Sequence, residues 1–550
     1  MENPLKIGVD FDNTIVKYDE LIYDIAIRKG FIDSGQEKNK KLIRDAVRKT
    51  QDGELKWMAV QAEAYGPGIS SARPFNGVEE FFRLCAEKRY RTYIVSHKTE
   101  YAASEPGGIN LREAAMSWMQ ERGFYGDEDI GVDKERVHFE SSRLEKISRI
   151  KSLGLTHFID DLEETFLEAT FPGDVQKILF CPSAPDSIPE GSLVFRSWDE
   201  IICYFISVGK GFGVKTLERL VNERVFSAEM IGKGKNSFVY LMRTYGKKRF
   251  AAKFYNGKTM EGRSRGFVEF SALRFLWDNG IRSIPEPVSA DFENDVAIYE
   301  YIGANEVDSG QISEADIDQA LEFLLKLNKI SGAEGSGELY PASEACFSLT
   351  ELTVNIQKRI DSLKAVEKNQ RLRNFLSTDF SPAFIKLSGW AEKYLEVNGI
   401  DYAESLPLAQ RILSPSDFGF HNARRMEDGQ LKFVDFEYFG WDDPAKLISD
   451  FLYHPGMNLD DELKLRFIEG SMKIFGQSGQ LDIRLRALYP LFGMKWIMIF
   501  LNEFLPGRLD RLGMSPNGER AAIVKERQLE KANSLLGYII ESYKHPPCFN

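Results

Sequence analysis

Short, continuously apolar segments alternate with amphipathic stretches over about the first 208 residues of the chain. The predicted strands are Lys6–Val9, Thr92–Val95, His157–Ile159 and Lys177–Phe180. The predicted helices between them include Val78–Lys88, Leu111–Arg122 and Arg143–Leu153. Strands of a parallel sheet are apolar at nearly every position because helices cover both faces. The alternation therefore predicts an α/β fold with a parallel sheet.

A polar and largely helical segment, from about residue 17 to residue 72, separates the first predicted strand from the others. In sheets of this kind the functional residues lie at the carboxyl ends of the strands. Asp10, Ser96 and Asp160 each follow directly after a predicted strand, so we expect them at one edge of the sheet. The segment 17–72 is then expected to form a cap over that edge.

A glycine-rich segment follows, and the pattern changes after it. Gly209-Lys210-Gly211-Phe212-Gly213 predicts a hinge, because several glycines weaken any regular element. Its spacing to Lys215-Thr216 approaches that of a phosphate-binding P-loop, but Val214 occupies the position of the second glycine. We therefore predict a linker at 209–214 between two domains, 1–208 and 215–550.

Beyond the predicted linker, residues 225–302 alternate strands and turns around one helix, whereas residues 315–545 are mostly helical. This order predicts an α+β domain of two lobes, with a small sheet lobe followed by a large helical lobe. A chain of 550 residues also exceeds what one hydrophobic core supports, which favours at least two domains.

Composition and charge exclude several classes of protein. The net charge of −12 leaves no surplus of Lys and Arg for binding nucleic acid. The five cysteines are scattered without a Cys-x-x-Cys pair, which favours reduced thiols and no zinc site. The most apolar window, Leu488–Leu505, contains Pro490, Lys495 and Glu503, and predicts a buried helix and not a membrane span. No targeting segment is recognisable, so we expect a cytoplasmic protein without a nucleic-acid or membrane partner. The sequence does not indicate its oligomeric state.

Two carboxylates one residue apart follow the first predicted strand, in Ile7-Gly8-Val9-Asp10-Phe11-Asp12-Asn13-Thr14. Hydrolysis through a covalent intermediate needs a nucleophile and a separate proton shuttle, and Asp10 and Asp12 can supply both. A cation such as Mg²⁺ is needed to bring a phosphate dianion against a carboxylate, and Asp160 can provide an oxygen ligand for it. A helix N-cap would explain one acid, but not two acids together with a serine and an Asp-Asp pair at three strand ends.

This pattern resembles the motifs of the haloacid-dehalogenase (HAD) superfamily of phosphatases, which have a Rossmann-like domain with a cap. The matching residues, in order, are Asp10-Phe11-Asp12-Asn13-Thr14, Ser96, Lys146 and Asp160-Asp161. The resemblance implies that Asp10 is the nucleophile and a metal ligand. It also implies that Asp12 is the general acid and base, with its backbone carbonyl on the metal.

The resemblance further implies that Asp160 completes the Mg²⁺ shell, while Ser96 and Lys146 bind the phosphoryl group that is transferred. The motif of the lysine is marked only by its spacing. Lys98 and Lys151 are therefore alternatives to Lys146.

A glycine turn and an ion pair are predicted in the second half of the chain. Gly232 and Gly234 predict a turn between strands, and such a turn can lie over phosphates. Lys253 lies in the apolar strand Phe250–Tyr255, and Glu269, sixteen residues later in a helical stretch, can pair with it. These are parts that transfer of a phosphoryl group from ATP requires, because the charge of three phosphates must be neutralised.

Asp417 and Asn422 stand five residues apart, before a predicted strand that ends in Asp435. Phosphoryl transfer from ATP needs a base at the acceptor hydroxyl and oxygen ligands that hold the metal ions. Asp417 fits the base, and Asn422 and Asp435 fit the metal ligands.

This second set is similar to the aminoglycoside phosphotransferase and choline/ethanolamine kinase group, which has a bilobal, protein-kinase-like fold, over about residues 215–545. Asp435-Phe436-Glu437-Tyr438 is closest to the choline-kinase-like branch, which implies that Glu437 is a further acid at the metals. The sequence departs from the group where Pro415-Ser416 replaces the usual His-Gly before the catalytic Asp. A protein kinase is disfavoured, because no His-Arg-Asp loop and no long activation segment are present.

The two halves together predict a bifunctional enzyme with Mg²⁺ and ATP as cofactors. Its partners would be a small phosphate ester, which is hydrolysed, and a small molecule such as a sugar or an amino alcohol, whose hydroxyl is phosphorylated. The two activities are expected to act at different positions, because opposed activities on one oxygen would only consume ATP. The alternative is a phosphatase with a regulatory, ATP-binding pseudokinase domain. Retention of Asp417, Asn422 and Asp435 favours the enzyme.

Overall fold

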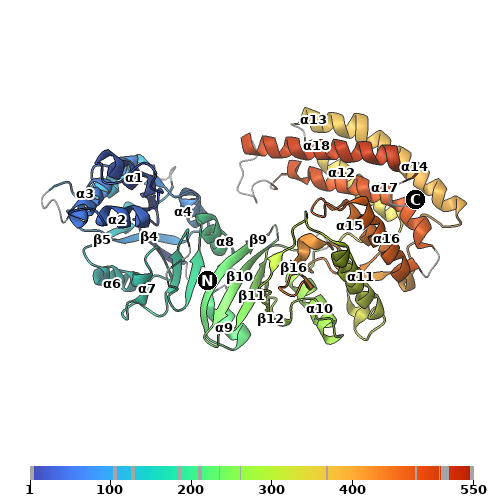
Figure 1. Ribbon diagram of the computed structural model, residues 1–550, viewed down its shortest axis with the longest axis horizontal. Coiled ribbons are helices and arrows are strands. Elements are labelled where there is room, and N and C mark those ends of the chain that lie inside the picture. The colour runs from blue at the N-terminus through green and yellow to red at the C-terminus, as the bar shows by residue number, and fades with distance from the viewer. Residues whose placement is uncertain are drawn as a thin grey trace. The chain divides into compact units, whose positions relative to one another are not determined.

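The computed structural model describes residues 5–545 except 103–107, 126–129, 184, 186, 209–212, 235, 260–261, 367–368, 477–479, 507 and 509–518. The chain divides into two compact units (Figure 1). The first contains residues 1–233 and 238–252, and the second contains residues 234–237 and 253–550. Of the predicted linker, residues 209–212 lie outside the described residues, and Val214 is already the first residue of helix α9 (Val214–Val221).

The first unit is built on six parallel strands. They are β1 (Lys6–Val9), β4 (Arg91–His97), β5 (Val137–Glu140), β6 (His157–Asp160), β7 (Gln176–Phe180) and β8 (Ser192–Phe195). Their order in the sheet is β5-β4-β1-β6-β7-β8, with every neighbouring pair parallel. The chain therefore winds outward from β1 in both directions, and the direction reverses between β1 and β6. This reversal point is where ligands bind in open α/β sheets.

The strand register places the expected site residues at one edge. Val9 is paired with Ile94 on one side and with Ile159 on the other, so Asp10 and Asp160 follow at the same level, and Ser96 lies one residue further along β4. The apolar residues of β1, β4 and β6 that precede these polar residues are buried, and this is the pattern that predicted the strands.

Helices cover the sheet on both sides (Figure 1). They are α4 (Val78–Glu87), α5 (Leu111–Glu121), α6 (Arg143–Leu153), α7 (Glu163–Leu167) and α8 (Trp198–Val208). Ile147 and Ile150 of α6 and Phe166 of α7 pack with Phe158 of β6 in one core. On the other side, Phe81 of α4 packs against Trp198 and Phe205 of α8.

The segment that was predicted to form a cap is a helical insertion. It contains α1 (Asp19–Arg28), α2 (Lys40–Arg48) and α3 (Gly53–Tyr65). The chain enters it through β2 (Val16–Lys17) and leaves it through β3 (Arg73–Pro74), and these two short strands pair with each other. Both ends of the insertion are thereby fixed at one point beside the end of β1.

The sheet of the first unit continues beyond β8. That strand pairs in parallel with β9 (Val225–Lys233), from Ser192 with Ser227 to Val194 with Glu229. β9 then pairs with β10 (Ser237–Thr244) in an antiparallel hairpin. β11 (Arg249–Tyr255) follows β10 in the sheet order. The compact units therefore do not part at the glycine-rich segment, because residues on both sides of it belong to one sheet.

The second unit begins with a small mixed region and continues as a helical lobe. Helix α10 (Arg265–Asp278) precedes the hairpin of β12 (Pro287–Asp291) and β13 (Val296–Glu300). The main helices are α11 (Glu314–Lys329), α12 (Leu349–Lys364), α14 (Ser381–Val397), α15 (Pro444–Tyr453), α16 (Asp461–Phe475), α17 (Leu481–Phe500) and α18 (Glu519–Ser542). The short strand pairs β15 (Ile412–Ser414) with β18 (Gly440–Asp442), and β16 (Ala423–Arg425) with β17 (Leu431–Phe433), lie between α14 and α15 in the chain.

Helix α17 forms the centre of the helical lobe. It packs against α12, α14, α15 and α18, and most of its residues are buried on all sides. Most of the apolar window Leu488–Leu505 falls on this helix, which explains the high hydrophobicity of the window. Within the part of the chain that the structure describes, no helix is both long and apolar enough to span a bilayer.

Candidate functional sites

The first site lies where β1 and β6 end. Lys146, in α6, donates to Asp10 Oδ1 at 2.7 Å and to Asp160 Oδ2 at 2.6 Å, and all three side chains are buried. Burial acts to lower the pKa of Lys146, but the two carboxylates outweigh it and raise this pKa. The side chain is therefore an ammonium held between two acids, where it can bind a phosphoryl group.

A cluster of acids surrounds this lysine. Burial raises the pKa of Asp10 to about 7, with Lys146 opposing and Asp160 adding to the shift. Burial and the charge of Asp160 likewise raise the pKa of Asp161 well above its usual range. Oxygen atoms of Asp10, Asp160 and Asp161 lie within 4.8 Å of one another. Three closely spaced acids beside one lysine would be relieved of their repulsion by a divalent cation, and an all-oxygen donor set fits Mg²⁺.

Asp12 is held apart from this cluster. Lys98 donates to both of its carboxylate oxygens, at 2.9 and 2.7 Å, and the Tyr18 hydroxyl donates to Oδ1 at 2.7 Å. Lys98 follows β4 and Tyr18 precedes α1, so the sheet and the cap both orient this carboxylate. The separate setting of Asp12 suits a role different from that of Asp10.

A cavity of about 370 Å³ lies over these residues. Asp10, Asp12, Ser96 and Lys146 line it from the sheet side, and the cap contributes Lys40, Met58, Gln61 and Tyr65. Ser96 is 1% exposed, and its hydroxyl has no hydrogen-bond partner among the described residues. An unpaired buried hydroxyl costs about 1–3 kcal/mol, which a ligand oxygen in the cavity would recover.

The structure thus brings Asp10, Asp12, Ser96 and Lys146 together at one cavity, and Asp160 contacts Lys146 directly. Of the two alternatives for the lysine, Lys98 is also at the cavity, whereas Lys151 is exposed in the last turn of α6. The contact of Lys98 with Asp12 was not predicted.

The second site is centred on Lys253. Its ammonium lies 2.7 Å from Glu269 Oε2 in α10 and 2.7 Å from Asp435 Oδ1. The Tyr255 hydroxyl and the backbone N–H of Phe436 also donate to Glu269. Burial raises the pKa of Glu269 despite the adjacent lysine. The predicted pairing of Lys253 with Glu269 is therefore present, and it fixes Asp435 next to it.

Glu437 lies beside this group. Arg265 donates to Oε1 at 3.0 Å, and the side-chain amide of Asn236 donates to the same oxygen at 2.7 Å. The other oxygen, Oε2, is buried and has no hydrogen-bond partner among the described residues. Burial and the charge of Asp435 raise the pKa of Glu437. An unpaired buried carboxylate oxygen next to a second acid is a donor set that fits Mg²⁺.

The predicted glycine turn connects β9 with β10. Gly232 lies in β9 opposite Val239, and the Gly234 N–H donates to the carbonyl of Ser237 at 2.9 Å. Lys235 lies outside the described residues. The residue of this turn that reaches the site is Asn236, through Glu437 and the Tyr438 hydroxyl, and the glycine spacing gave no signal for it.

Asp417 lies in the loop after β15, and two imidazole rings approach it. His421 Nε2 is 3.2 Å and His454 Nε2 is 3.9 Å from the same oxygen, Oδ1. Burial acts to raise the pKa of Asp417, but the hydrogen bond and charge of His421 outweigh it and lower this pKa. Asn422 donates its side-chain N–H to the backbone carbonyl of Asp417 at 2.9 Å, which leaves its amide oxygen for another ligand. Neither histidine was predicted.

Local hydrogen bonds accommodate Ser416 of the Pro415-Ser416 pair. Ser416 has φ of +68°, a region that glycine adopts without strain and serine seldom does. Its hydroxyl donates to the carbonyl of Ser343 and accepts from Lys446 Nζ at 2.9 Å. Lys446 is in turn paired with Asp442 at 2.8 Å. Two hydrogen bonds thus hold the serine in a conformation that glycine usually occupies.

The acids that follow Glu437 have structural contacts. Asp443 is buried, caps the N-terminus of α15 and pairs with Arg484 of α17. Asp450 accepts from the indole N–H of Trp496 at 2.8 Å. These residues therefore hold α15 against α17.

No protein-family model matches this chain, and no curated protein matches it. Among solved structures, a Plasmodium vivax ethanolamine kinase is 14% identical, with a TM-score of 0.41, over 61% of this chain and 88% of that chain. A choline kinase from Streptococcus pneumoniae is 18% identical, with a TM-score of 0.38, over 60% and 99% of the two chains. A spectinomycin phosphotransferase in complex with ADP and spectinomycin is 16% identical, with a TM-score of 0.40, over 58% and 97%.

Proposed function

We propose that the chain is a bifunctional enzyme, a Mg²⁺-dependent phosphomonoester hydrolase in its first half and an ATP-dependent small-molecule kinase in its second half. The main support for the hydrolase is the contact of Lys146 with both Asp10 and Asp160. The unpaired hydroxyl of Ser96 lies at the same cavity as Asp10 and Lys146. The main support for the kinase is the contact of Lys253 with both Glu269 and Asp435.

In the hydrolase, Asp10 attacks phosphorus, and the bond from phosphorus to the ester oxygen breaks. Asp12 gives its proton to the departing alkoxide, then takes a proton from the water that hydrolyses the aspartyl phosphate. Ser96 and Lys146 bind the phosphoryl oxygens throughout. Asp10, the Asp12 backbone carbonyl and Asp160 would hold Mg²⁺, which supplies charge neutralisation to the phosphate when bound.

In the kinase, the acceptor hydroxyl gives its proton to Asp417, its oxygen bonds to the γ-phosphorus, and the bond to the β-phosphate oxygen breaks to release ADP. Lys253, oriented by Glu269, binds the ATP phosphates. Asn422, Asp435 and Glu437 would hold Mg²⁺, which neutralises phosphate charge when bound. A hydroxyl of a sugar or an amino alcohol is the class of acceptor that we propose.

One screen tests both halves. Each compound is incubated with Mg²⁺–ATP, and ADP and inorganic phosphate are measured in parallel. The compounds are choline, ethanolamine, spectinomycin, a series of hexoses and their phosphate esters. We expect acceptor-dependent ADP formation that Asp417→Asn abolishes, and ester hydrolysis that Asp10→Asn abolishes. ATP binding by calorimetry without ADP formation from any acceptor would instead support the regulatory, ATP-binding alternative.

The two acids of the kinase site are expected to differ in their effect on nucleotide binding. Asp435→Asn should weaken binding of Mg²⁺–ATP by about tenfold or more, because this carboxylate would hold metal in both the ground state and the transition state. Asp417→Asn should leave this affinity within about twofold and lower turnover instead, because Asp417 engages only the acceptor hydroxyl. Calorimetry with Mg²⁺–ATP measures the difference, and equal losses of affinity in the two variants would contradict the assignment.

A further inference from the structure

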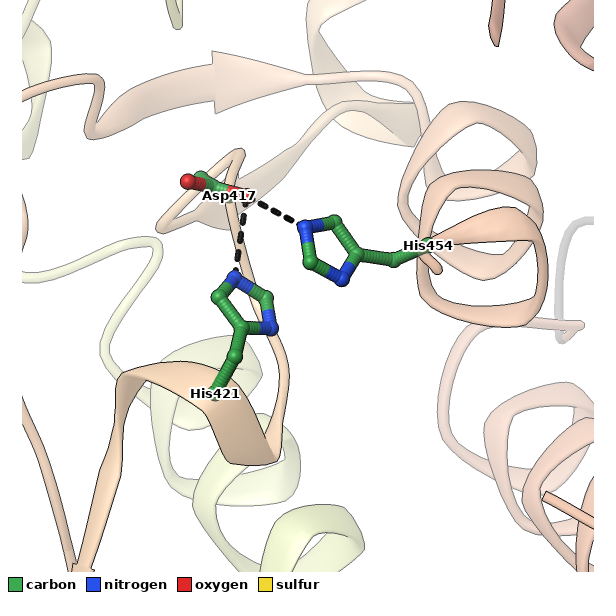
Figure 2. A group of neighbouring side chains, drawn as sticks. All are labelled: Asp417, His421 and His454. Atoms are coloured by element: carbon green, nitrogen blue, oxygen red, sulfur yellow. Dashed lines mark hydrogen bonds and ion pairs between the residues drawn. The ribbon is translucent and has the colours of Figure 1, made fainter. Parts of the chain in front are cut away.

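Two histidines from separate parts of the helical lobe meet at Asp417. His421 lies in the short helical turn Phe420–Asn422, and His454 ends helix α15. Their rings are stacked, with centroids 3.7 Å apart and planes within 10° of parallel. Figure 2 shows both Nε2 atoms directed at Oδ1 of Asp417, while the second carboxylate oxygen points away from the rings.

The surroundings of the ring nitrogens indicate where each ring carries its proton. The backbone N–H of Gly456 donates to Nδ1 of His454 at 3.1 Å, so this nitrogen is an acceptor and the neutral ring carries its proton on Nε2. Nδ1 of His421 is buried without a hydrogen-bond partner among the described residues, whereas its Nε2 faces a carboxylate oxygen, which can only accept. Both rings therefore present an N–H group to the same oxygen.

The same arrangement opposes a metal ion at this place, although the three groups are close enough to hold one. A ligating Nε2 must present a lone pair, which in a neutral ring moves the proton to Nδ1. For His454, that proton would face the N–H of Gly456.

The packing around His454 holds its ring in place. The Trp496 indole meets the ring edge to face, at a centroid distance of 5.1 Å, and Trp496 is itself bonded to Asp450 of α15. The backbone N–H of His454 closes the last turn of α15 on the carbonyl of Asp450. The ring is thus fixed by α15 and α17 before any substrate binds.

We propose that His421 and His454 are positioning residues for the kinase reaction. His421 donates its Nε2–H to Asp417 Oδ1 at 3.2 Å, and His454, stacked on His421 with its own Nε2 3.9 Å from the same oxygen, holds that ring in place, so that Oδ2 is aimed at the acceptor hydroxyl. This role rests on the proposed function, in which Asp417 accepts the proton of that hydroxyl. A carboxylate with both oxygens free rotates about its side-chain bonds, whereas one anchored through Oδ1 presents Oδ2 in a fixed direction.

Nitrogen-15 spectra of the histidine side chains test the geometry without any substrate. The whole chain has only six histidines, and His421→Gln and His454→Gln assign the two signals of interest. We expect both rings to carry a proton on Nε2, and we expect both signals to shift in Asp417→Ala. The control is His157, whose Nε2 lies 3.1 Å from the Tyr204 hydroxyl in the first unit and whose signals should not move. An Nδ1–H tautomer at His454, unshifted signals in Asp417→Ala, or displacement of either signal by stoichiometric Zn²⁺ would overturn the proposal.

The rate of ADP formation from Mg²⁺–ATP tests the positioning role, with choline, ethanolamine, spectinomycin and water as acceptors. His421→Leu should lower kcat by about tenfold to a hundredfold with little change in the KM for ATP, and His421→Gln, which retains an N–H donor, should recover part of the loss. The double variant Asp417→Ala/His421→Leu should be no slower than Asp417→Ala, because the histidine acts through the carboxylate. Additive losses or an unchanged rate in His421→Leu would overturn the positioning role.

The outcomes distinguish failure of the positioning role from failure of the kinase function. If Asp417→Ala abolishes turnover and His421→Leu does not affect it, the kinase function stands and the positioning role fails. If Asp417→Ala turns over ATP as fast as the wild type, or no acceptor is phosphorylated, the kinase function itself fails and the positioning role fails with it.

Discussion

Replacement of Asp10 by Asn is expected to abolish Mg²⁺-dependent hydrolysis of p-nitrophenyl phosphate, with a loss on the order of 10⁴-fold or more. An amide is a poor nucleophile and a weaker metal ligand than a carboxylate. A neutral amide also cannot form an ion pair with Lys146, whose ammonium lies 2.7 Å from Asp10 Oδ1 and 2.6 Å from Asp160 Oδ2. One substitution thus affects the proposed nucleophile, a proposed metal ligand and the lysine that we propose to bind phosphate.

The measurement is the release of p-nitrophenol by the full chain, and ADP formation in the kinase assay should stay unchanged in the same preparation. Asp174→Asn is the matched control, because Asp174 is an exposed acid of the same unit. Hydrolysis by Asp10→Asn at the rate of the wild type would show that the acid cluster at β1 and β6 is not the hydrolytic site.

Much of the first site could be predicted because its residues follow buried strands directly. Strand Lys6–Val9 and helix Arg143–Leu153 have the predicted bounds, since a continuous apolar run and a clear helical period leave little ambiguity. Strand β5 was missed because Val-His-Phe-Glu is half-buried at the sheet edge and alternates with polar residues. Strand β8 was missed because it directly follows residues 182–191, whose prolines, serines and glycine are typical of a loop.

The side-chain contacts that complete the sites could not be predicted, because they join residues far apart in the chain. Lys98 and Lys146 could not be separated by spacing, and both lie at the cavity, each on a different aspartate. His454 reaches Asp417 only because α15 ends beside the loop after β15. A single sequence gives no signal for such proximity.

The pairing of strands across the glycine-rich segment could not be predicted from the sequence either. Glycines at 209–213 predict local freedom of the backbone, but local freedom does not decide whether strands on either side of a segment pair. β8 and β9 pair in parallel from Ser192 with Ser227 onward, and Arg196, after β8, forms an ion pair with Glu229 of β9 at 2.5 Å. A connection with glycines and helix α9 is compatible with such a pair, because parallel strands need a crossover between them.

A fragment that ends at Val208 is therefore expected to be much less stable than one that ends at Asn256, which contains β9, β10 and β11. In the shorter fragment, β8 becomes an edge strand, and Leu193, Val194 and Phe195 lose the cover of β9 and of Tyr240, whose ring lies 6.2 Å from that of Phe195. Full burial of each large apolar side chain contributes about 1.5–3 kcal/mol, so the loss should amount to several kcal/mol. An exposed apolar edge also favours aggregation.

Urea unfolding of fragments 1–208 and 1–256 measures this difference, with soluble yield and light scattering as second readouts. Both fragments carry the complete acid cluster, the cap and the cavity, so hydrolysis of p-nitrophenyl phosphate by fragment 1–256 should match that of the full chain. Glu229→Gln in the full chain, which removes the ion pair with Arg196 and leaves the strand pairing, should change stability by less than about 1 kcal/mol. Equal urea midpoints for the two fragments would show that β8 closes the sheet without β9, and that the hydrolase ends at the glycine-rich segment as its composition predicts.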